Sequence, residues 1–188
     1  MVSLILEAAT RVFIEEGYEA ASTNKIAEKA GISVGSLYQY FPNKEAIAAA
    51  LYDQLSIKAI EIAQDRLKKL VRRPLRQAIP EAIGIIVELY ESGPELIQTT
   101  LPHLLELERT NSFEAFRERS AAMLLAFLQS RREELREGDL PHMAWVVAFV
   151  TESLIFRIMQ GTPPHLSKKK LLLQVDELIA RYLLAPGD

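Results

Sequence analysis

Apolar residues recur at every third or fourth position along most of the chain, and no stretch alternates apolar with polar residues as a half-buried strand does. This spacing predicts an all-α protein of about nine helices. Glycine, proline and capping residues separate the apolar runs and set the helix ends. The predicted helices cover approximately residues 3–16, 23–30, 34–40, 44–71, 74–91, 94–107, 112–138, 140–160 and 168–184.

The segment from residue 22 to residue 44 predicts a helix-turn-helix. Ser22 is a favourable N-cap for the helix at 23–30, and Gly31 is a favourable residue to end it. Ser33 caps the next helix and Pro42 stops it. Two short helices joined by a tight turn with glycine form the unit that places its second helix in the major groove of DNA. The apolar side chains expected to turn inward together are Ile26, Ala27, Ala30, Ile32, Leu37 and Phe41.

The same segment resembles a known family. Residues 26–33 (IAEKAGIS) and 35–45 (GSLYQYFPNKE) are similar to the N-terminal signature of TetR/AcrR-type transcriptional regulators, and the similarity reaches back through Phe13 and Tyr18. It covers roughly the first quarter of the chain. The resemblance implies an all-helical homodimer with a DNA-binding head and a larger C-terminal domain that binds a small-molecule inducer. We therefore expect a helix-turn-helix DNA-binding domain at residues 1–46 and a ligand-binding and dimerisation domain at residues 47–188.

Two groups of residues are expected to contact DNA. Ser36 and Gln39 face outward and are expected to read bases, because glutamine can bond adenine N6 and N7, while small or compact neighbours allow close approach. At the rim of the motif, hydroxyl, amide and lysine side chains are expected to hold phosphates, a role that the resemblance gives to tyrosine and lysine here. For the tyrosines, packing against the first helix is the alternative. The full set is Thr23, Asn24, Lys25, Ser33, Val34, Gly35, Ser36, Tyr38, Gln39, Tyr40 and Lys44.

The net charge is unusual for a DNA-binding head. The chain has a formal charge of −3, and residues 1–47 carry four lysines and arginines against six glutamates. A DNA-binding domain usually shows a basic surface. The balance fits DNA binding if the glutamates of the first helix face away from the motif, leaving Lys25, Lys29 and Lys44 around the turn. With so few cations, affinity is expected to depend on two heads that bind together.

The last two predicted helices carry more apolar surface than one body needs. In the helix at 140–160, one set of apolar residues (Trp145, Phe149, Phe156, Met159) lies opposite another (Met143, Val147, Val150, Leu154, Ile158). A helix that is apolar on opposite sides is covered on both. Together with the helix at 168–184, it predicts a two-fold four-helix interface of a homodimer. The alternative is that both helices complete the core of a monomer.

A ligand pocket is predicted around Glu152, which lies between Phe149 and Phe156 on an aromatic face. A carboxylate there is costly to bury unpaired. One interpretation is that it recognises a cationic or hydroxyl-bearing inducer. The other is that it forms a structural ion pair with an arginine of a neighbouring helix or is solvated at the edge of the interface, and this second interpretation is favoured. The other candidate lining residues, each of them often plain core, are Tyr90, His103, Met123 and Phe127.

Other chemistry has little support. There are no cysteines, and His103, His142 and His165 lack metal-like spacing, so neither a metal nor a cofactor is expected. No nucleophile elbow or phosphate loop points to an enzyme. The basic pairs and triplet at 72–73, 131–132 and 168–170 are interpreted as solvated helix ends. No signal peptide or membrane span is expected, which favours a cytoplasmic protein.

We therefore predict a ligand-responsive transcriptional regulator that binds double-stranded DNA. In its simplest form it is a repressor that an apolar or weakly polar small-molecule inducer releases from a palindromic operator. The alternative is a helix-turn-helix module that protein partners regulate, or that acts as an activator without a small-molecule inducer.

Overall fold

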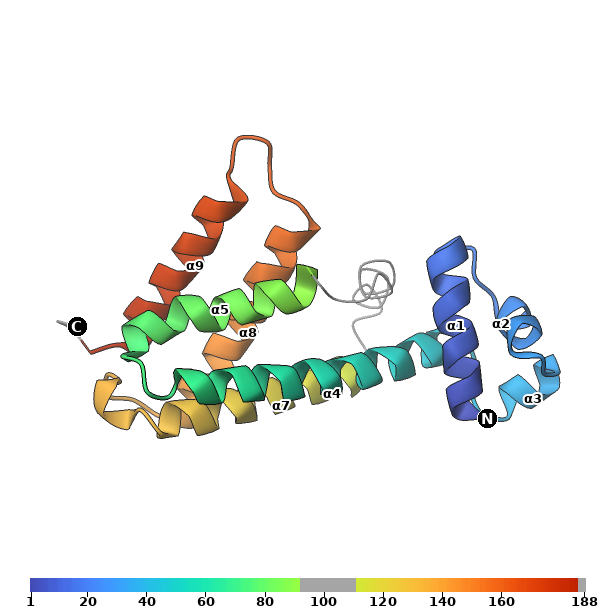
Figure 1. Cartoon of the computed structure of the whole chain (residues 1–188), viewed down its shortest axis with the longest axis horizontal. Coiled ribbons are helices and arrows are strands. Elements are labelled where there is room, and N and C mark those ends of the chain that lie inside the picture. The colour runs from blue at the N-terminus through green and yellow to red at the C-terminus, as the bar shows by residue number, and fades with distance from the viewer. Residues whose placement is uncertain (92–110, 186–188) are drawn as a thin grey trace. The chain divides into compact units, whose positions relative to one another are not determined.

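The computed structural model describes residues 1–91 and 111–185, and every regular element in them is helical (Figure 1). The prediction of an all-α protein is confirmed. The helix predicted near residues 94–107 lies outside the described residues. The elements are α1 (Val2–Glu16), α2 (Thr23–Ala30), α3 (Val34–Tyr38), α4 (Lys44–Leu70), α5 (Leu75–Glu91), α7 (Asn111–Gln129), the 3₁₀ helix η1 (Arg132–Glu134), α8 (Leu140–Gln160) and α9 (Lys168–Leu183).

The chain divides into two compact units. The smaller unit includes Met1–Lys58, and therefore α1, α2, α3 and the first half of α4. The larger unit contains the second half of α4 together with α5, α8, α9 and most of α7. Helix α4 therefore begins in the smaller unit and ends in the larger one.

The smaller unit forms around the caps that the sequence predicts. The Ser22 side chain accepts a hydrogen bond from the Lys25 backbone N–H and starts α2. Gly31 ends α2 in the left-handed conformation with φ 69°, where its N–H reaches the carbonyls of the last turn. Fully buried apolar side chains from the three helices and from the start of α4 hold the unit together: Ile5, Ala9, Phe13, Ile26, Ala27, Leu37 and Ile47.

Two local predictions are wrong. Helix α3 ends at Tyr38, two residues early, because the following backbone N–H groups turn back to the Leu37 carbonyl. Helix α7 ends at Gln129 rather than near residue 138.

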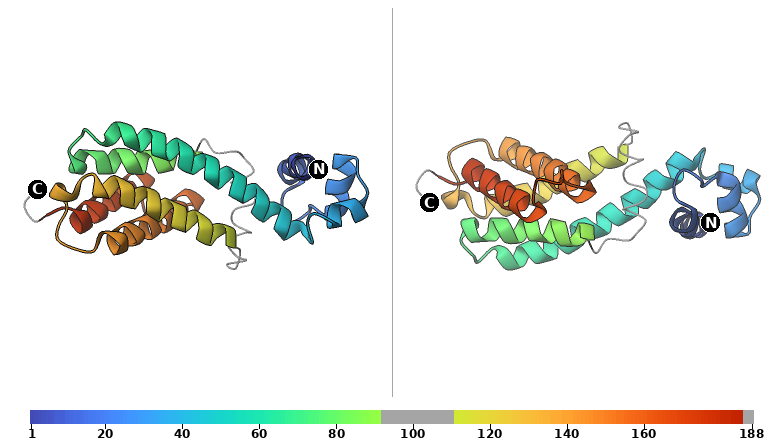
Figure 2. Two further views of the ribbon diagram at one scale, coloured as in Figure 1. Left: turned by 90° about the horizontal axis from the view of Figure 1, so that it is seen from below. Right: turned by 90° about the horizontal axis from the view of Figure 1, so that it is seen from above.

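The core of the larger unit draws on α4, α5, α7, α8 and α9. Figures 1 and 2 show α5, α8 and α9 next to one another, and these helices contact one another in pairs. By length and composition alone α8 could cross a membrane. Its residues Met143, Val147 and Ile155 are instead buried against the neighbouring helices, as in the core helix of a folded domain.

Arg131 caps the end of α4 from the segment that follows α7. Its side chain is almost fully buried, although the sequence pattern places it among solvated basic residues. The guanidinium donates to the carbonyls of Leu70 (3.1 Å), Val71 (2.9 Å) and Arg73, at the end of α4 and in the turn that follows it. Its Nε also donates to Glu134 at 2.7 Å. One buried side chain therefore satisfies carbonyls at the end of a helix about 60 residues earlier in the chain.

Candidate nucleic-acid interface and ligand site

The outward face of α3 carries the residues expected to read bases. The Ser33 Oγ accepts a hydrogen bond from the Ser36 backbone N–H at 3.0 Å and starts the helix. Gly35 and Gln39 are exposed. A Cβ placed on Gly35 would meet only the Ser33 Oγ, at 3.9 Å, so the packing of the unit does not require a glycine here. The absence of a side chain leaves the backbone of α3 open to close approach by another molecule.

Ser36 is already engaged. Its Oγ lies 2.8 Å from the Ser33 Oγ, and the side chain is half-buried. A hydroxyl has a donor and two acceptor sites, so Ser36 retains capacity for a further bond. Gln39 is exposed, and its amide makes no hydrogen bond to the described residues. Of the two side chains, that of Gln39 is the longer and reaches further from the helix.

Both tyrosines at the end of the motif are about half exposed, Tyr38 at 50% and Tyr40 at 46%, so neither is buried by packing against α1. The Tyr38 hydroxyl lies 3.0 Å from the Thr23 Oγ1 and joins the start of α2 to the end of α3. Two hydroxyls, the first backbone N–H groups of α2 and the exposed Asn24 side chain therefore occupy one rim of the motif. Helix N-termini and hydroxyls are common phosphate contacts.

The sequence suggested that the lysines of the head would be left unpaired around the turn. In the structure they are not. Lys25 pairs with Glu16 at 2.5 Å and Lys29 pairs with Glu15 at 2.7 Å, so the glutamates at the end of α1 face α2. All four side chains are at least one-third exposed. Exposed pairs of this kind contribute only about 0–1 kcal/mol, so a phosphate could compete for either lysine.

Lys44 makes a different kind of contact. Its ammonium donates to the Tyr18 carbonyl at 2.8 Å and lies 4.4 Å from the centre of the Tyr18 ring. Burial, with the charges of Glu45 and Glu19, raises the pKa of Tyr18 to about 12. Lys44 thus fastens the start of α4 to the turn after α1. An ammonium has three donors, and those not used by carbonyls remain for phosphate.

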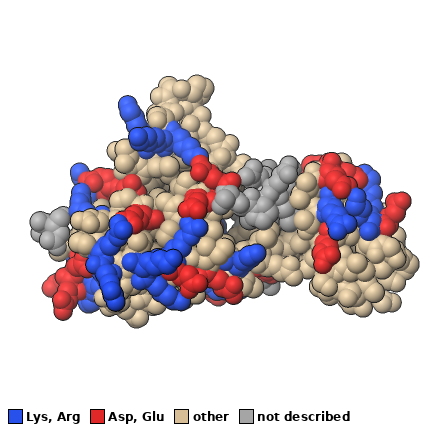
Figure 3. All heavy atoms as spheres, viewed as in Figure 1, with Lys and Arg blue, Asp and Glu red and all other residues tan. Residues whose placement is uncertain are grey.

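The surface over α3 carries no charge in the view of Figure 3, where the charged side chains of the smaller unit gather over α1 and α2. No residue from 32 to 43 is charged. The face with the geometry of a recognition helix therefore offers hydroxyls, an amide and backbone rather than cations.

In the larger unit, Glu152 is half-buried and paired. The Arg117 Nε lies 3.5 Å from the Glu152 Oε2, and the Arg117 guanidinium lies 5.2 Å from the centre of the Phe149 ring. Phe149 in turn stacks on Trp145, with ring centres 5.3 Å apart. Burial raises the pKa of Glu152, and Arg117 acts against that rise. The pair matches the structural interpretation of Glu152, an ion pair with an arginine of a neighbouring helix.

The other candidate pocket residues do not form one group. Tyr90 meets Phe156 edge-on with ring centres 6.1 Å apart, and its hydroxyl accepts a hydrogen bond from Gln160 at 2.9 Å. Phe127 is buried, and its ring centre lies 5.8 Å from the Arg131 guanidinium. It follows Arg117 by ten residues along α7, which corresponds to about 15 Å of helix. Met123 packs against the core. His103 lies outside the described residues.

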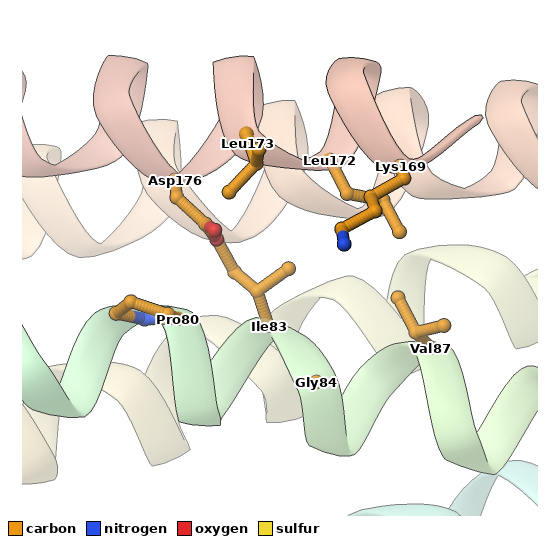
Figure 4. Close-up of a pocket in the computed structure, with 8 residues that line it drawn as sticks. All are labelled: Pro80, Ile83, Gly84, Val87, Lys169, Leu172, Leu173 and Asp176. Atoms are coloured by element: carbon orange, nitrogen blue, oxygen red, sulfur yellow. The ribbon is translucent and has the colours of Figure 1, made fainter. Parts of the chain in front are cut away.

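A feature that sequence reasoning missed is a groove of about 220 Å³ between α5 and α9 (Figure 4). None of the candidate pocket residues that the structure describes lines it. Its walls come from two helices that are far apart in the sequence, and no motif marks them. The lining residues are Pro80, Ile83, Gly84, Val87, Lys169, Leu172, Leu173 and Asp176.

Comparison with known families accounts for both units. A family model described as "Bacterial regulatory proteins, tetR family" matches residues 5–51, and one described as "Tetracyclin repressor-like, C-terminal domain" matches residues 74–183. The chain belongs to the tetR family. It is therefore a DNA-binding transcriptional regulator and not an enzyme, as the signature in the helix-turn-helix implied.

Individual relatives in the tetR family share only part of their sequence with this chain. The HTH-type transcriptional regulator PksA of Bacillus subtilis is 26% identical over 183 residues, which are 97% of this chain and 78% of that protein. The fatty acid metabolism regulator protein of the same organism is 37% identical over 65 residues, 35% of this chain and 34% of that protein. SmeT, the repressor of the Stenotrophomonas maltophilia multidrug efflux pump SmeDEF, has the same fold, with a TM-score of 0.67 and 21% sequence identity. The match covers 100% of this chain and 92% of the SmeT chain.

Proposed function

We propose that this tetR-family regulator is a homodimeric repressor that leaves a palindromic operator when a small molecule binds its larger unit, and that it acts in the cytoplasm. The observation that carries the DNA-binding part is the capped α3 with exposed Gly35 and Gln39 beside the hydroxyls of Thr23 and Tyr38. Residues 1–46 act as the DNA-binding domain and residues 47–188 as the ligand-binding and dimerisation domain. A repressor among the fold relatives, SmeT, supports repression as the first hypothesis.

Dimerisation through α8 and α9 follows from apolar surface that a single chain leaves open. Trp145 is 51% exposed and Leu178 is 49% exposed, and Phe149 is also exposed. Large apolar side chains that gather on neighbouring helices mark an interface more often than a free surface. In a dimer the two α3 helices reach half-sites about one helical turn, ~34 Å, apart.

The proposed switch uses α4, which begins in the smaller unit and ends in the larger one. A ligand that binds among the helices of the larger unit would shift α4 and the spacing of the two α3 helices. It needs only to prefer the spacing that does not fit the operator, and couplings of about 1–3 kcal/mol are typical. An apolar or weakly polar inducer suits the aromatic residues Tyr90, Phe149 and Phe156.

The test begins with selection of bound sequences from random duplex DNA. Candidate small molecules are then screened for release of the selected operator, with fluorescence anisotropy as the readout. The proposal predicts a palindrome and at least one compound that raises the apparent Kd. If every compound leaves the Kd unchanged and the protein raises transcription from the operator, the activator hypothesis is favoured. One relative, 33% identical over 95 residues, is the transcriptional activator FasR of Mycolicibacterium smegmatis.

Glu152→Gln separates two roles of the Arg117–Glu152 pair. If Glu152 recognises a cationic inducer, the variant binds operator normally and responds poorly to the inducer. If the pair is structural, as we expect, the variant loses thermal stability and keeps its response. Glu177→Gln, which breaks exposed pairs with Arg181 of α9 and Arg76 of α5, is the matched control.

A further inference from the structure

The groove between α5 and α9 has an apolar interior with polar groups at its two ends (Figure 4). Ile83 and Val87 of α5 face Leu172 and Leu173 of α9 across it. At Gly84 the wall has no side chain, and a Cβ built there would meet nothing within 4 Å. The space above Gly84 is therefore open to a small apolar group.

One end of the groove holds a carboxylate oxygen without a donor. Asp176 lines the groove, and its Oδ1 is shielded from solvent with no hydrogen bond to any of the described residues. Burial raises the pKa of this carboxyl group. A shielded carboxylate oxygen normally has a partner, because leaving it without one is costly.

The other end is cationic. Lys169 lies seven residues before Asp176, two turns or about 10 Å along α9. In Figure 4 its ammonium points into the groove. A ligand that satisfies this arrangement carries a charged donor at the Asp176 end and an uncharged apolar body, because a second cation at the far end would meet Lys169.

We propose that the α5–α9 groove is a binding site for small aliphatic monoamines in their ammonium form. The ammonium donates to Asp176, and the alkyl chain lies over Gly84 along the leucines of α9. The site is separate from the Arg117–Glu152 pair. Binding there does not depend on operator release, so its test is independent of the proposed repressor function.

Calorimetric titration of the full chain with hexylammonium tests the proposal, with 1-hexanol, hexanoate and hexane-1,6-diammonium as comparison ligands. Hexylammonium should bind more tightly than the other three. Asp176→Asn should weaken hexylammonium binding by about ten-fold or more, since hydrogen bonds to a charged group are the strong ones, and should leave hexanol unchanged. The control Glu177→Gln removes the adjacent carboxylate outside the groove and should have little effect.

Two further variants keep the test decisive if Asp176→Asn does not fold. Lys169→Gln alters an exposed side chain and should let the diammonium ligand bind as well as hexylammonium. Gly84→Leu fills the groove and should abolish binding of every ligand in the series.

Three results would overturn the proposal. The first is the absence of hexylammonium binding to the native chain. The second is an equal loss from Glu177→Gln and Asp176→Asn, which would indicate general attraction to an acidic surface. The third is a failure of every amine to bind together with a change in the sedimenting mass of Gly84→Leu, which would show that a second copy of the chain covers the groove.

Discussion

Replacing Arg131 by alanine should destabilise the larger unit far more than any neighbouring surface change. The residue is only 6% exposed, and its guanidinium serves the carbonyls of Leu70, Val71 and Arg73 as well as Glu134. The change leaves several acceptors without their donor. Net hydrogen bonds contribute about 1 kcal/mol each and broken buried ion pairs cost about 3–5 kcal/mol.

Glu134 is 37% exposed, so water screens its part of the loss and the lower end of the range applies. We expect the free energy of unfolding to fall by about 3 kcal/mol, which for a chain of this size corresponds to a Tm lower by roughly 6–12 °C. Urea and thermal unfolding followed by far-ultraviolet circular dichroism measure both quantities. The adjacent Arg132 is exposed and bonds only carbonyls of its own loop, so Arg132→Ala is the matched control, with an expected change under about 1 kcal/mol.

The effect should also depend on pH. The hydrogen bond from Arg131, and then the Leu75 backbone N–H, hold the pKa of Glu134 below its ordinary value of 4.5. A lowered pKa stabilises the fold above the unfolded-state value and ceases to do so as the pH falls through the folded-state value. The difference between the native chain and Arg131→Ala should therefore narrow below about pH 4. Equal unfolding free energies for Arg131→Ala and Arg132→Ala at neutral pH would show that the Arg131 contacts do not stabilise the larger unit.

Three other perturbations test separate parts of the account. Leu178→Glu should convert the proposed dimer to monomers in analytical ultracentrifugation. Leu173→Glu should not, because Leu173 is equally apolar and exposed but lies about 140° around α9 from Leu178. Identical masses for the two variants would argue against the α8–α9 interface. Gly84→Ala should raise the free energy of unfolding by about 0.5–1 kcal/mol, because the added Cβ meets nothing within 4 Å. Gly31→Ala should lower it by about 1 kcal/mol, because φ is 69° there, and changes of the same sign in the two variants would contradict this expectation. Lys44→Ala should lower the salt dependence of DNA binding by about one phosphate equivalent for every sequence, and a loss confined to one operator would count against a phosphate contact.

Features governed by neighbouring residues were predicted well from the sequence. The cap at Ser22 and the left-handed turn at Gly31 depend on a few adjacent positions, and both occur as expected. The family signature lies in the same stretch. The start of α8 after Asp139 is equally local, since that side chain accepts from the His142 backbone N–H at 3.0 Å.

Features that depend on distant residues were not predicted. Arg131 looks like a surface arginine until the end of α4, about 60 residues earlier, is placed beside it. The pairing of Lys25 with Glu16 crosses the turn between two helices and cannot be read from helical periodicity. The candidate ligand residues share an aromatic character but not a location, because periodicity gives the face of a helix and not the neighbour that covers it.

Selection of bound sequences from random duplex DNA, done side by side with the native chain and Gln39→Ala, shows whether α3 reads bases through Gln39. The native chain should select a palindrome with half-sites about one helical turn apart. Gln39→Ala should relax the preference at one base pair in each half-site, worth about 1–3 kcal/mol of discrimination, with nonspecific binding nearly intact. An identical sequence preference in the two proteins would contradict the assignment of α3 as the recognition helix that reads bases through Gln39.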